Sequence, residues 1–381
     1  MKRIEKHSDN LPNGLKLMIP GPVSVERHVL DKMSLPLVPH YGSEWAEFYH
    51  ETISLFGRVQ QTNGRIFLLV GSGSAGLDAA IGTASAVLPK ILVLKNGHFG
   101  ERLEEIARAY ADIVSTLSFP FDVPIDPARV DDTLNHQPAD LVLVTHCETS
   151  SGILNPIREL ADACRRNNAL LLVDAISSLG IEPLPMDEWG IALCVSASQK
   201  GLGAPPGLAT VAISRAAWDR IRLGDSKGWY LNLTVWDRYE RERTEWHPHP
   251  VTHAVGNVRA LRAALQDVLH EGLPETYARH REVAAFLRRG LEDLGCVPAI
   301  PSDFASHGVT SVRSPCDKVE TLLDCLRDNF GILVTGGLGM WKGKIFRIGH
   351  MGPAATLESI NSLLPALGRA LKMTLTQESR T

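Results

Sequence analysis

Residues 195–214 read VSASQKGLGAPPGLATVAIS, an apolar run that ends in Gln199 and Lys200 and continues into a loop rich in Gly and Pro. Lys200 is the only charged residue of this stretch. A lysine in apolar surroundings loses hydration, which lowers its pKa and makes its amine nucleophilic. The stretch therefore predicts a buried strand that ends at a reactive amine, with an ordinary surface lysine as the alternative.

Short apolar runs without alternation also occur elsewhere in the chain, as is typical of strands buried on both faces. These runs are residues 65–70, 90–95, 140–145, 169–174, 193–198 and 208–214. Segments with apolar residues three or four positions apart lie between several of them, which indicates helices. Alternating strands and helices predict an α/β fold, with a mostly parallel sheet that has helices on both faces.

The pattern changes at about residue 255, where two long helical segments begin. Short strand-like segments over 308–314 and 344–350 follow, with a helical segment between them. This order is typical of a smaller α+β domain. We therefore expect an N-terminal extension over residues 1–17, a large domain over 18–255 and a small C-terminal domain over 256–381.

The composition narrows the class of protein. The chain has 381 residues, of which 44% are hydrophobic and 22% charged, as in globular proteins. Lys and Arg (39) are slightly outnumbered by Asp and Glu (43), so no basic surface for nucleic acid is expected.

The six cysteines form no CxxC pair, which indicates buried thiols in a reducing compartment. Without a signal peptide or an apolar run of membrane length, we expect a cytoplasmic protein with no membrane partner.

Ligands of open α/β sheets bind beyond the carboxyl ends of the strands, so the residues that follow each run are candidates. Residues 71–76, GSGSAG, follow the first run and lead into a helix. Glycines let a ligand approach the backbone, and the free N–H groups of a helix start suit a phosphate. A tight turn without a ligand is the alternative. The stretch lacks the lysine of a P-loop.

Three other strand ends carry chemically informative residues. Phe99 lies in the glycine-rich turn 96–100, where its ring can stack on a planar ligand or simply pack. Asp174 ends a strongly apolar run, and burying its carboxylate is costly unless a cation or an N–H group meets it. His146, Cys147 and Glu148 follow another run, but neighbouring residues on an extended stretch point to opposite faces. We therefore expect no metal site there.

A phosphate cradle, an aromatic ring, a buried carboxylate and a desolvated lysine at the ends of strands in one sheet together predict a pyridoxal 5'-phosphate site. This cofactor requires phosphate contacts, a stacking partner, an acid for its ring nitrogen and a Schiff-base lysine. The acid keeps the ring nitrogen protonated, and the released lysine amine moves a proton. A nicotinamide cofactor would explain neither the lysine nor the order of these groups.

The same motifs resemble class V, fold-type I pyridoxal-phosphate-dependent aminotransferases of the alanine–glyoxylate and serine–pyruvate group. The segments that carry the resemblance, in the family's order and spacing, are IPGPVSV (19–25), GSGSAGLDAA (71–80), NGHFGERL (96–103), HCETSSGILNPI (146–157), LLVDAISSLG (171–180), SQKGLGAPPG (198–207) and RIGHMG (347–352). The resemblance implies a fold-type I transferase with a large cofactor-binding domain. It also implies a homodimer with its active site at the subunit interface.

By this resemblance, Lys200 is the catalytic residue that forms the internal aldimine, and Asp174 pairs with the pyridinium nitrogen. The other cofactor contacts that it implies are Ser72, Gly73 and Ser74 at the phosphate, Gln199 beside them, Phe99 on the ring and Thr149 near the ring's phenolic oxygen. In the substrate pocket, Gly21 lines the wall and Arg347 binds the substrate carboxylate through a bidentate fork.

One segment departs from the family pattern. Relatives reach into the neighbouring subunit's phosphate site with a Thr-Pro-Pro-like stretch, whereas residues 246–253 here read WHPHPVTH. The threonine is out of register. His247, His249 and Thr252 are the alternatives for this contact.

The resemblance implies an aminotransferase that moves an amino group from a small donor to a 2-oxo acid, glyoxylate or pyruvate, by a ping-pong mechanism. A 2-aminoethylphosphonate donor is one alternative and would require basic residues, for which Arg102, Lys227 and Lys342 are candidates. Pyridoxamine is another alternative donor. A lyase of the cysteine desulfurase type would need a reactive cysteine, but Cys316 lies before a predicted helix, where a structural thiol is the better interpretation.

Overall fold

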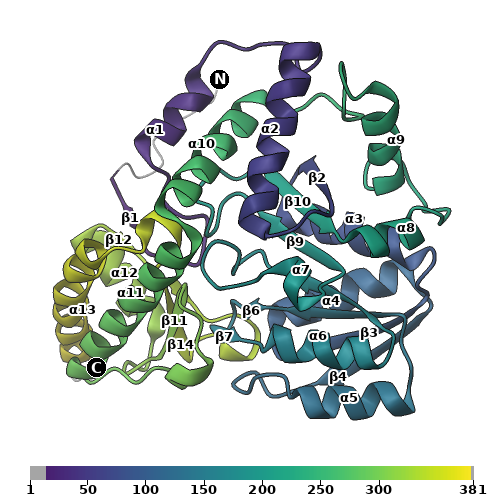
Figure 1. Ribbon diagram of the computed structural model, residues 1–381. Helices are drawn as coiled ribbons and strands as arrows, with labels where there is room; N and C mark the ends of the chain where they lie inside the picture. Colours follow the sequence, from purple (N-terminus) through teal and green to yellow (C-terminus); the bar gives the residue numbers. More distant parts are fainter. Residues whose placement is uncertain (1–13, 379–381) are drawn as a thin grey trace, which may run out of the picture.

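The computed structural model describes residues 14–378, so residues 1–13 of the predicted extension lie outside the description. The large domain is built on a seven-stranded sheet in the order β2-β10-β9-β8-β5-β3-β4 (Figure 1). Its strands are β2 (Arg65–Val70), β3 (Lys90–Lys95), β4 (Ile113–Ser118), β5 (Leu141–Thr145), β8 (Leu170–Asp174), β9 (Leu193–Ala197) and β10 (Leu208–Ile213). Strand β10 is antiparallel to both of its neighbours, and the other pairs are parallel. The predicted mostly parallel sheet is confirmed.

Each central strand sends alternate side chains to opposite faces of the sheet. In β3, Leu92 and Leu94 enter one hydrophobic core, whereas Ile91 and Val93 enter the other. The first core includes side chains of α2 (Ser43–Gln60), α5 (Pro127–His136), α6 (Ile157–Arg166), α7 (Met186–Trp189) and α10 (Val255–Glu271). The second includes those of α3 (Gly73–Ser85), α4 (His98–Tyr110), α8 (Arg215–Ile221) and α9 (Leu233–Arg243). Because both faces are covered, the central strands consist mostly of apolar residues.

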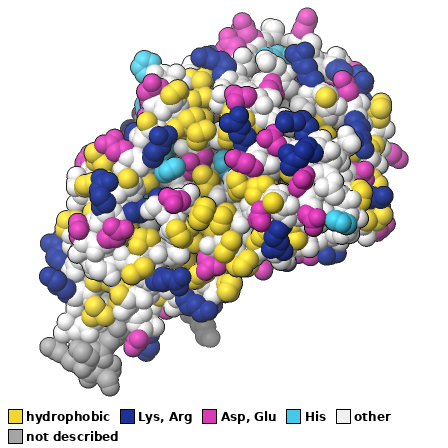
Figure 2. Space-filling model, turned by 60° about the horizontal axis from the view of Figure 1, so that its bottom comes forward, with side chains coloured by type: hydrophobic (Ala, Val, Ile, Leu, Met, Phe, Trp, Pro, Cys, Tyr) yellow, Lys and Arg dark blue, Asp and Glu magenta, His cyan; other side chains and the backbone are white. Residues whose placement is uncertain are grey.

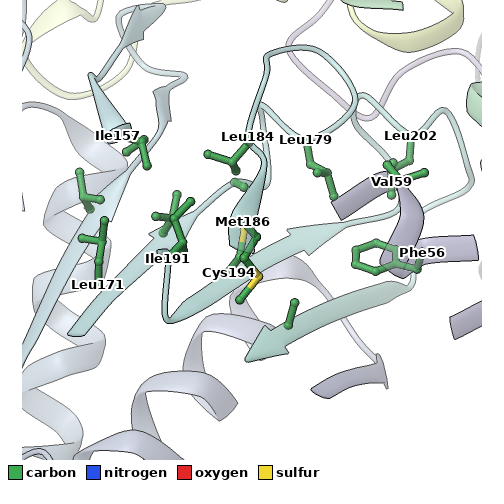
Figure 3. Close-up of a cluster of buried hydrophobic side chains, with 14 of the residues drawn as sticks. Phe56, Val59, Ile157, Leu171, Leu179, Leu184, Met186, Ile191, Cys194 and Leu202 are labelled. Carbon is green, nitrogen blue, oxygen red and sulfur yellow. The ribbon is translucent and has the colours of Figure 1, made fainter. Parts of the chain in front are cut away.

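The first core fixes the strands that carry the candidate residues. Figure 3 shows some of its side chains, among them Phe56 of α2, Met186 of α7, and Leu171 and Cys194 of β8 and β9. Full burial of a large apolar side chain stabilises the fold by roughly 1.5–3 kcal/mol. The carboxyl ends of β8 and β9 therefore have well-supported positions, and so do the residues that follow them.

A second, smaller sheet belongs to the C-terminal part of the chain. Strands β11 (Val309–Arg313), β14 (Ile345–Gly349) and β13 (Thr335–Gly336) form an antiparallel sheet in that order. A separate hydrophobic core joins it to α11 (Leu273–Asp293), α12 (Val319–Phe330) and α13 (Leu357–Glu378). The predicted α+β character of this part is confirmed.

The N-terminal segment connects the two parts of the molecule. Strand β1 (Lys16–Leu17) pairs in parallel with β12 (Ile332–Leu333), and Met18 is buried in the C-terminal core. A few residues later, the Val23 N–H donates to the Gln199 carbonyl of the large domain, at 3.1 Å. Helix α10 packs alongside α2 (Figure 1), and the predicted boundary at 255/256 falls at its first residue. The domain limits remain a prediction.

Several whole-chain features bear on the sequence predictions. No disulfide joins the six cysteines, which all lie in the described part, and five of them are buried as predicted. No helix within residues 14–378 has the length and apolar character needed to cross a bilayer. On the face displayed in Figure 2, acidic and basic side chains are interspersed and do not form a field of one sign.

Candidate active site

Two adjoining cavities, of about 300 and 310 Å³, lie at the carboxyl edge of the large sheet. The predicted residues that line the first cavity are Gly21, Ser72, Gly73, Ser74, Phe99, Thr149, Asp174, Gln199 and Lys200. Arg347 lines the second cavity, which shares Lys200 and Phe99 with the first. The fold thus brings together all the residues predicted to contact the cofactor and the substrate carboxylate, although they come from distant parts of the chain.

Lys200 follows β9 and projects toward the N-terminal segment. Its Nζ donates a hydrogen bond to the carbonyl of Pro20. Desolvation by burial lowers the pKa of Lys200 to about 8, although the nearby Cys147 and Asp174 act in the opposite direction. Gly21 has φ +95°, and a Cβ at this position would lie 2.5 Å from the Lys200 Cδ atom. Glycine is therefore required here, both by the backbone conformation and by the close approach of the lysine.

Asp174 is the last residue of β8 and is 4% exposed. Among the described residues, its carboxylate accepts a hydrogen bond from the Ile176 N–H, at 3.0 Å. Desolvation by burial raises the pKa of Asp174 to about 6, partly offset by this N–H and increased by the charge of Glu148. The cost of burying this carboxylate is thus only partly compensated within the chain, which favours a cationic ligand group beside it.

The start of α3 forms one end of the first cavity. Ser72 precedes the helix with an extended backbone, and its side chain makes no capping hydrogen bond. A Cβ on Gly73 would lie 2.5 Å from Ile176 Cδ1, so the chain needs glycine at this packed position. Beside it, the Oε1 atom of Gln199 is buried without a hydrogen-bond partner. The uncapped N–H groups and the positive end of the helix dipole suit a phosphate.

Phe99 and Thr149 form another wall. The guanidinium carbon of Arg102 lies 4.9 Å from the centroid of the Phe99 ring. The Thr149 hydroxyl donates to Ser177 Oγ, at 2.7 Å. Ser177 also lines the first cavity, and sequence reasoning missed it. Its position three residues after Asp174, beyond the same strand end, was the available signal.

The sequence pattern brought Glu148 into question only as a metal ligand. In the structure, its carboxylate instead accepts hydrogen bonds from backbone N–H groups. It belongs to β6 (Cys147–Glu148), which pairs with β7 (Ile153–Leu154), and it is fully buried. Its carboxylate accepts from the N–H groups of Phe99 and Gly100, at 3.0 and 3.1 Å. Within residues 14–378, no group of three or more His, Cys, Asp or Glu side chains is arranged to hold a metal ion.

Arg347 reaches the site from the C-terminal sheet. Its Nε donates to the Gly336 carbonyl and one terminal nitrogen donates to the Thr149 carbonyl, both at 2.9 Å. Burial lowers the pKa of Arg347 to about 10, while the charge of Glu148 acts to raise it. The side chain thus presents a buried guanidinium, held by two carbonyls, to the second cavity. Its planar fork suits a ligand carboxylate.

Comparison with known proteins agrees with this geometry. Residues 41–349 match the protein family described as Aminotransferase class-V. The chain belongs to this family. Over 366 residues, this class-V aminotransferase is 36% identical to an uncharacterised aminotransferase of Methanocaldococcus jannaschii, covering 93% of this chain and 94% of the relative. It is 30% identical over 380 residues to the pyridoxamine–pyruvate transaminase of Mesorhizobium japonicum, covering 97% and 94% of the two chains.

A solved structure supports the same assignment. The crystal structure of an alanine–glyoxylate aminotransferase from Nostoc sp. matches with a TM-score of 0.90 at 30% identity, covering 97% of this chain and 98% of that one. The class-V aminotransferase therefore has the predicted fold-type I architecture. Enzymes of this family depend on pyridoxal phosphate. The unpartnered Gln199 oxygen, the uncapped helix start and the under-compensated Asp174 fit that cofactor.

The remaining sequence candidates are less closely associated with the site. Arg102 lines the first cavity, but Lys227 and Lys342 line neither cavity and are exposed. Cys316 is buried and lies before α12, away from both cavities. The class-V aminotransferase therefore places no second lysine at the site for a phosphonate. It also places Cys316 away from the position that a lyase of the desulfurase type requires.

Proposed function

We propose that this chain is a pyridoxal-phosphate-dependent aminotransferase that moves an amino group from a small amino donor to a 2-oxo acid, glyoxylate or pyruvate. The observation that carries the proposal is a set of three charged groups around two joined cavities, namely the buried Asp174 and Arg347 and the partly buried Lys200. Among the described residues, no ion pair within the chain neutralises any of them. Their expected partners are the cofactor and a substrate carboxylate.

The residues that would hold the cofactor follow from the cavity walls. The start of α3, with Ser72, Gly73 and Ser74, would bind the phosphate, and Gln199 would supply its side chain nearby. Asp174 would meet the ring nitrogen, and Phe99 would stack on the ring. When bound, the cofactor supplies an electron sink for the bond broken at the substrate Cα.

The chain's own groups then perform two tasks. Lys200, with a pKa lowered to about 8, has a substantial neutral fraction near neutral pH and can take and return a proton at the substrate Cα. Arg347 orients the substrate by its carboxylate, which places the Cα near Lys200. Both groups line the second cavity, so one substrate can contact both.

The second cavity favours a small donor side chain. Besides Arg347 and Lys200, its walls include Ile19, Leu333, Val334 and Leu338. Apolar walls bind a methyl group without leaving polar atoms unpaired, whereas a phosphonate would lose hydration there. We therefore propose an alanine-like donor ahead of 2-aminoethylphosphonate, with pyridoxamine as the second candidate because one relative carries that name.

We also propose that the enzyme works as a homodimer. An exposed apolar patch lies over α1 (Arg27–Asp31) and the residues that follow it, and its members are Leu30, Met33, Leu35, Leu37, Val38 and Tyr41.

His249 is fully buried, accepts a hydrogen bond from Trp45 Nε1 at 2.8 Å, and has no free reach toward a neighbour. His247 and Thr252 therefore remain for the proposed contact with the partner's phosphate site. A cytoplasmic location stays a prediction from the sequence.

The cofactor and its attachment are tested together. Purified protein supplied with pyridoxal 5'-phosphate should show a visible absorbance band, and borohydride should remove the band and fix the cofactor to the peptide that contains Lys200. Mass spectrometry of the digested protein identifies that peptide. A reducible adduct that still forms in Lys200→Ala protein would overturn the assignment.

The substrates are tested by a donor panel. Alanine, serine, 2-aminoethylphosphonate and pyridoxamine are each offered with glyoxylate or pyruvate, and the cofactor spectrum of each half-reaction is followed. Alanine or serine should convert the cofactor to its amino form, and the 2-oxo acid should restore it. Release of ammonia from a donor without any acceptor would contradict an aminotransferase. Sedimentation velocity on the same sample decides between a monomer and a dimer.

A further inference from the structure

Glu148 is the most completely surrounded carboxylate at the edge of the first cavity. It is fully buried and accepts four hydrogen bonds: from the N–H groups of Phe99, Gly100 and Ser150, at 3.0 to 3.1 Å, and from the Ser150 hydroxyl. Burial raises the pKa of Glu148 above its ordinary value, although the hydrogen bonds from Ser150, Gly100 and Phe99 act to lower it. Because every contact is a donor, the ionised, acceptor-only form of the carboxylate fits this environment.

Two of these donors belong to a helix that begins far away in the sequence. Helix α4 starts at His98, and its own cap residue, Gly97, has no side chain. A Cβ at Gly97 would lie 2.3 Å from the Glu148 carboxyl carbon, so the glycine makes room for the acid. The His98 N–H donates to Ser150 Oγ, at 3.2 Å. Residues 148–150 thus cap the first turn of α4 in place of a local side chain.

The capped turn is the one that carries Phe99. The ring belongs to the residue whose own N–H is bonded to Glu148, so moving the carboxylate moves the base of this side chain. The charge of Glu148 also acts to raise the pKa of both Asp174 and Arg347. Glu148 is therefore close enough to both candidate ligand-binding groups for its charge to act on them.

We propose that Glu148 is a positioning residue that holds the Phe99 ring against the cofactor cavity through the backbone of residues 99 and 100. The inference rests on the proposed function, because it assigns the ring a cofactor to stack on. Glu148 does not line either cavity itself. It acts through Phe99.

A double-mutant cycle on cofactor affinity tests this coupling. Apoenzyme is titrated with pyridoxal 5'-phosphate for the wild type, Glu148→Gln, Phe99→Ala and the double variant, at a temperature well below each melting point. Phe99→Ala should weaken binding about tenfold. Glu148→Gln should weaken it about fivefold, and the double variant should be no weaker than Phe99→Ala.

The control and the contrary outcomes separate positioning from folding. Glu101→Gln makes the same change in the first turn of α4, at an exposed carboxylate, and should leave cofactor affinity unchanged. Additive losses, about fiftyfold in the double variant, would show that Glu148 does not act through Phe99. Unchanged affinity in Glu148→Gln would also overturn the inference, while the wild type would still bind. A wild type that binds no cofactor would instead overturn the proposed function.

A second acid variant keeps the test decisive. Glu148→Asp retains the charge but shortens the side chain by one methylene, so its oxygens cannot keep both the Phe99 and the Ser150 donors. If Glu148→Gln does not fold, the same cycle is run with Glu148→Asp. A loss that disappears in the Phe99→Ala background supports positioning, and a loss that persists there contradicts it.

Discussion

Two buried carboxylates of the large domain, Asp174 and Glu182, have opposite surroundings. Asp174 receives one hydrogen bond, from the Ile176 N–H, whereas Glu182 receives bonds from the His307 N–H and Nδ1, at 2.6 and 2.7 Å, and from Ser306 Oγ at 3.2 Å. Burial raises the pKa of Asp174 to about 6. Burial also acts on Glu182, but the His307 hydrogen bonds leave its pKa below the ordinary value.

This difference separates a structural charge from a ligand-binding one. Glu182 lies between β8 and α7, and its donors come from the segment before β11, so the acid joins the large domain to the C-terminal part. Its charge is satisfied by the chain itself. Asp174 and Arg347 are buried, and Lys200 is partly buried, with less compensation than their charges require, and all three line the cavities. We therefore propose that the under-compensated charges mark the ligand site and that Glu182 marks a structural contact.

Lys200 gives the largest expected effect on the ligand-binding side of this comparison. Lys200→Ala should lower the rate of transamination by more than about a thousandfold, because the variant loses both the nucleophile and the proton carrier. Single-turnover kinetics with the best donor measures the loss. Lys90→Ala is the matched control. Lys90 is exposed and is the first residue of β3, whereas the cavities lie at the carboxyl ends of the strands, so this variant should keep full activity. Comparable rates of transamination in Lys200→Ala and Lys90→Ala would contradict the role assigned to Lys200.

Glu182 tests the structural side. Glu182→Gln removes the charge but leaves the His307 and Ser306 donors, so the free energy of unfolding should fall by about 3 kcal/mol. Urea denaturation at neutral pH measures this change, and the KM for the 2-oxo acid should stay within about twofold of the wild type. Glu292→Gln, at an exposed acid of α11, controls for the substitution itself. A large loss of substrate affinity with normal stability would reverse the assignment.

Arg347 is expected to affect substrate binding more than turnover. Arg347→Ala should raise the KM for the 2-oxo acid roughly 50-fold, because a charge-assisted pair with the carboxylate is lost. Arg347→Lys keeps the charge but lacks the planar guanidinium fork, so its KM should lie between those of the wild type and Arg347→Ala. Steady-state kinetics measures both, with the exposed Arg166→Ala as the control. An unchanged KM in Arg347→Ala would place the substrate carboxylate elsewhere.

Asp174 is expected to change the stability of the apoenzyme, and the sign of this change sharpens the comparison. The pKa of this carboxyl is raised from 3.8 to about 6 in the folded chain, so its contribution to stability is present below about pH 4 and is lost as the pH rises through about 6. The Asp174→Asn apoenzyme should therefore be more stable than the wild-type apoenzyme at pH 7, by up to about 3 kcal/mol. At pH 4 the two should be nearly equal.

Urea denaturation of both apoenzymes across this pH range measures the difference. With pyridoxal 5'-phosphate added, the order at pH 7 should reverse, because the wild-type carboxylate gains its cationic partner. An asparagine variant that is less stable at pH 7 without cofactor would mean that Asp174 is already compensated, as Glu182 is.

The sequence predicted most of the central sheet because burial on both faces leaves an apolar run at each inner strand. It did not indicate β4, an edge strand whose side chains are at least partly exposed, so that no apolar run marks it. The pairing of β1 with β12 was also missed. Each of these strands has two residues, and their partners are far apart in the sequence.

Site residues were predictable where a charged side chain ends an apolar run in the sequence. Lys200 and Asp174 each break an apolar run, and the resulting prediction that they lie together is matched by the cavity that they line. Glu148 also follows such a run, but its role depends on N–H groups from residues 99 and 100, which only the folded chain brings to it. Ser177 likewise could not be recognised from the sequence, because its place in the site depends on the hydrogen bond from Thr149, which joins two separate strand ends.

The N-terminal segment places a constraint on the order in which the enzyme is made. Pro20 and Gly21 form the wall against Lys200, but β1 just before them needs β12, which the ribosome produces near the end of the chain. At ordinary elongation rates, the interval between these two strands is roughly 15–60 s. During that time the large sheet can form while its lysine still lacks part of its enclosure. A chain that stops before residue 332 therefore carries Lys200 without the strand pairing that fixes the Pro20 and Gly21 wall beside it.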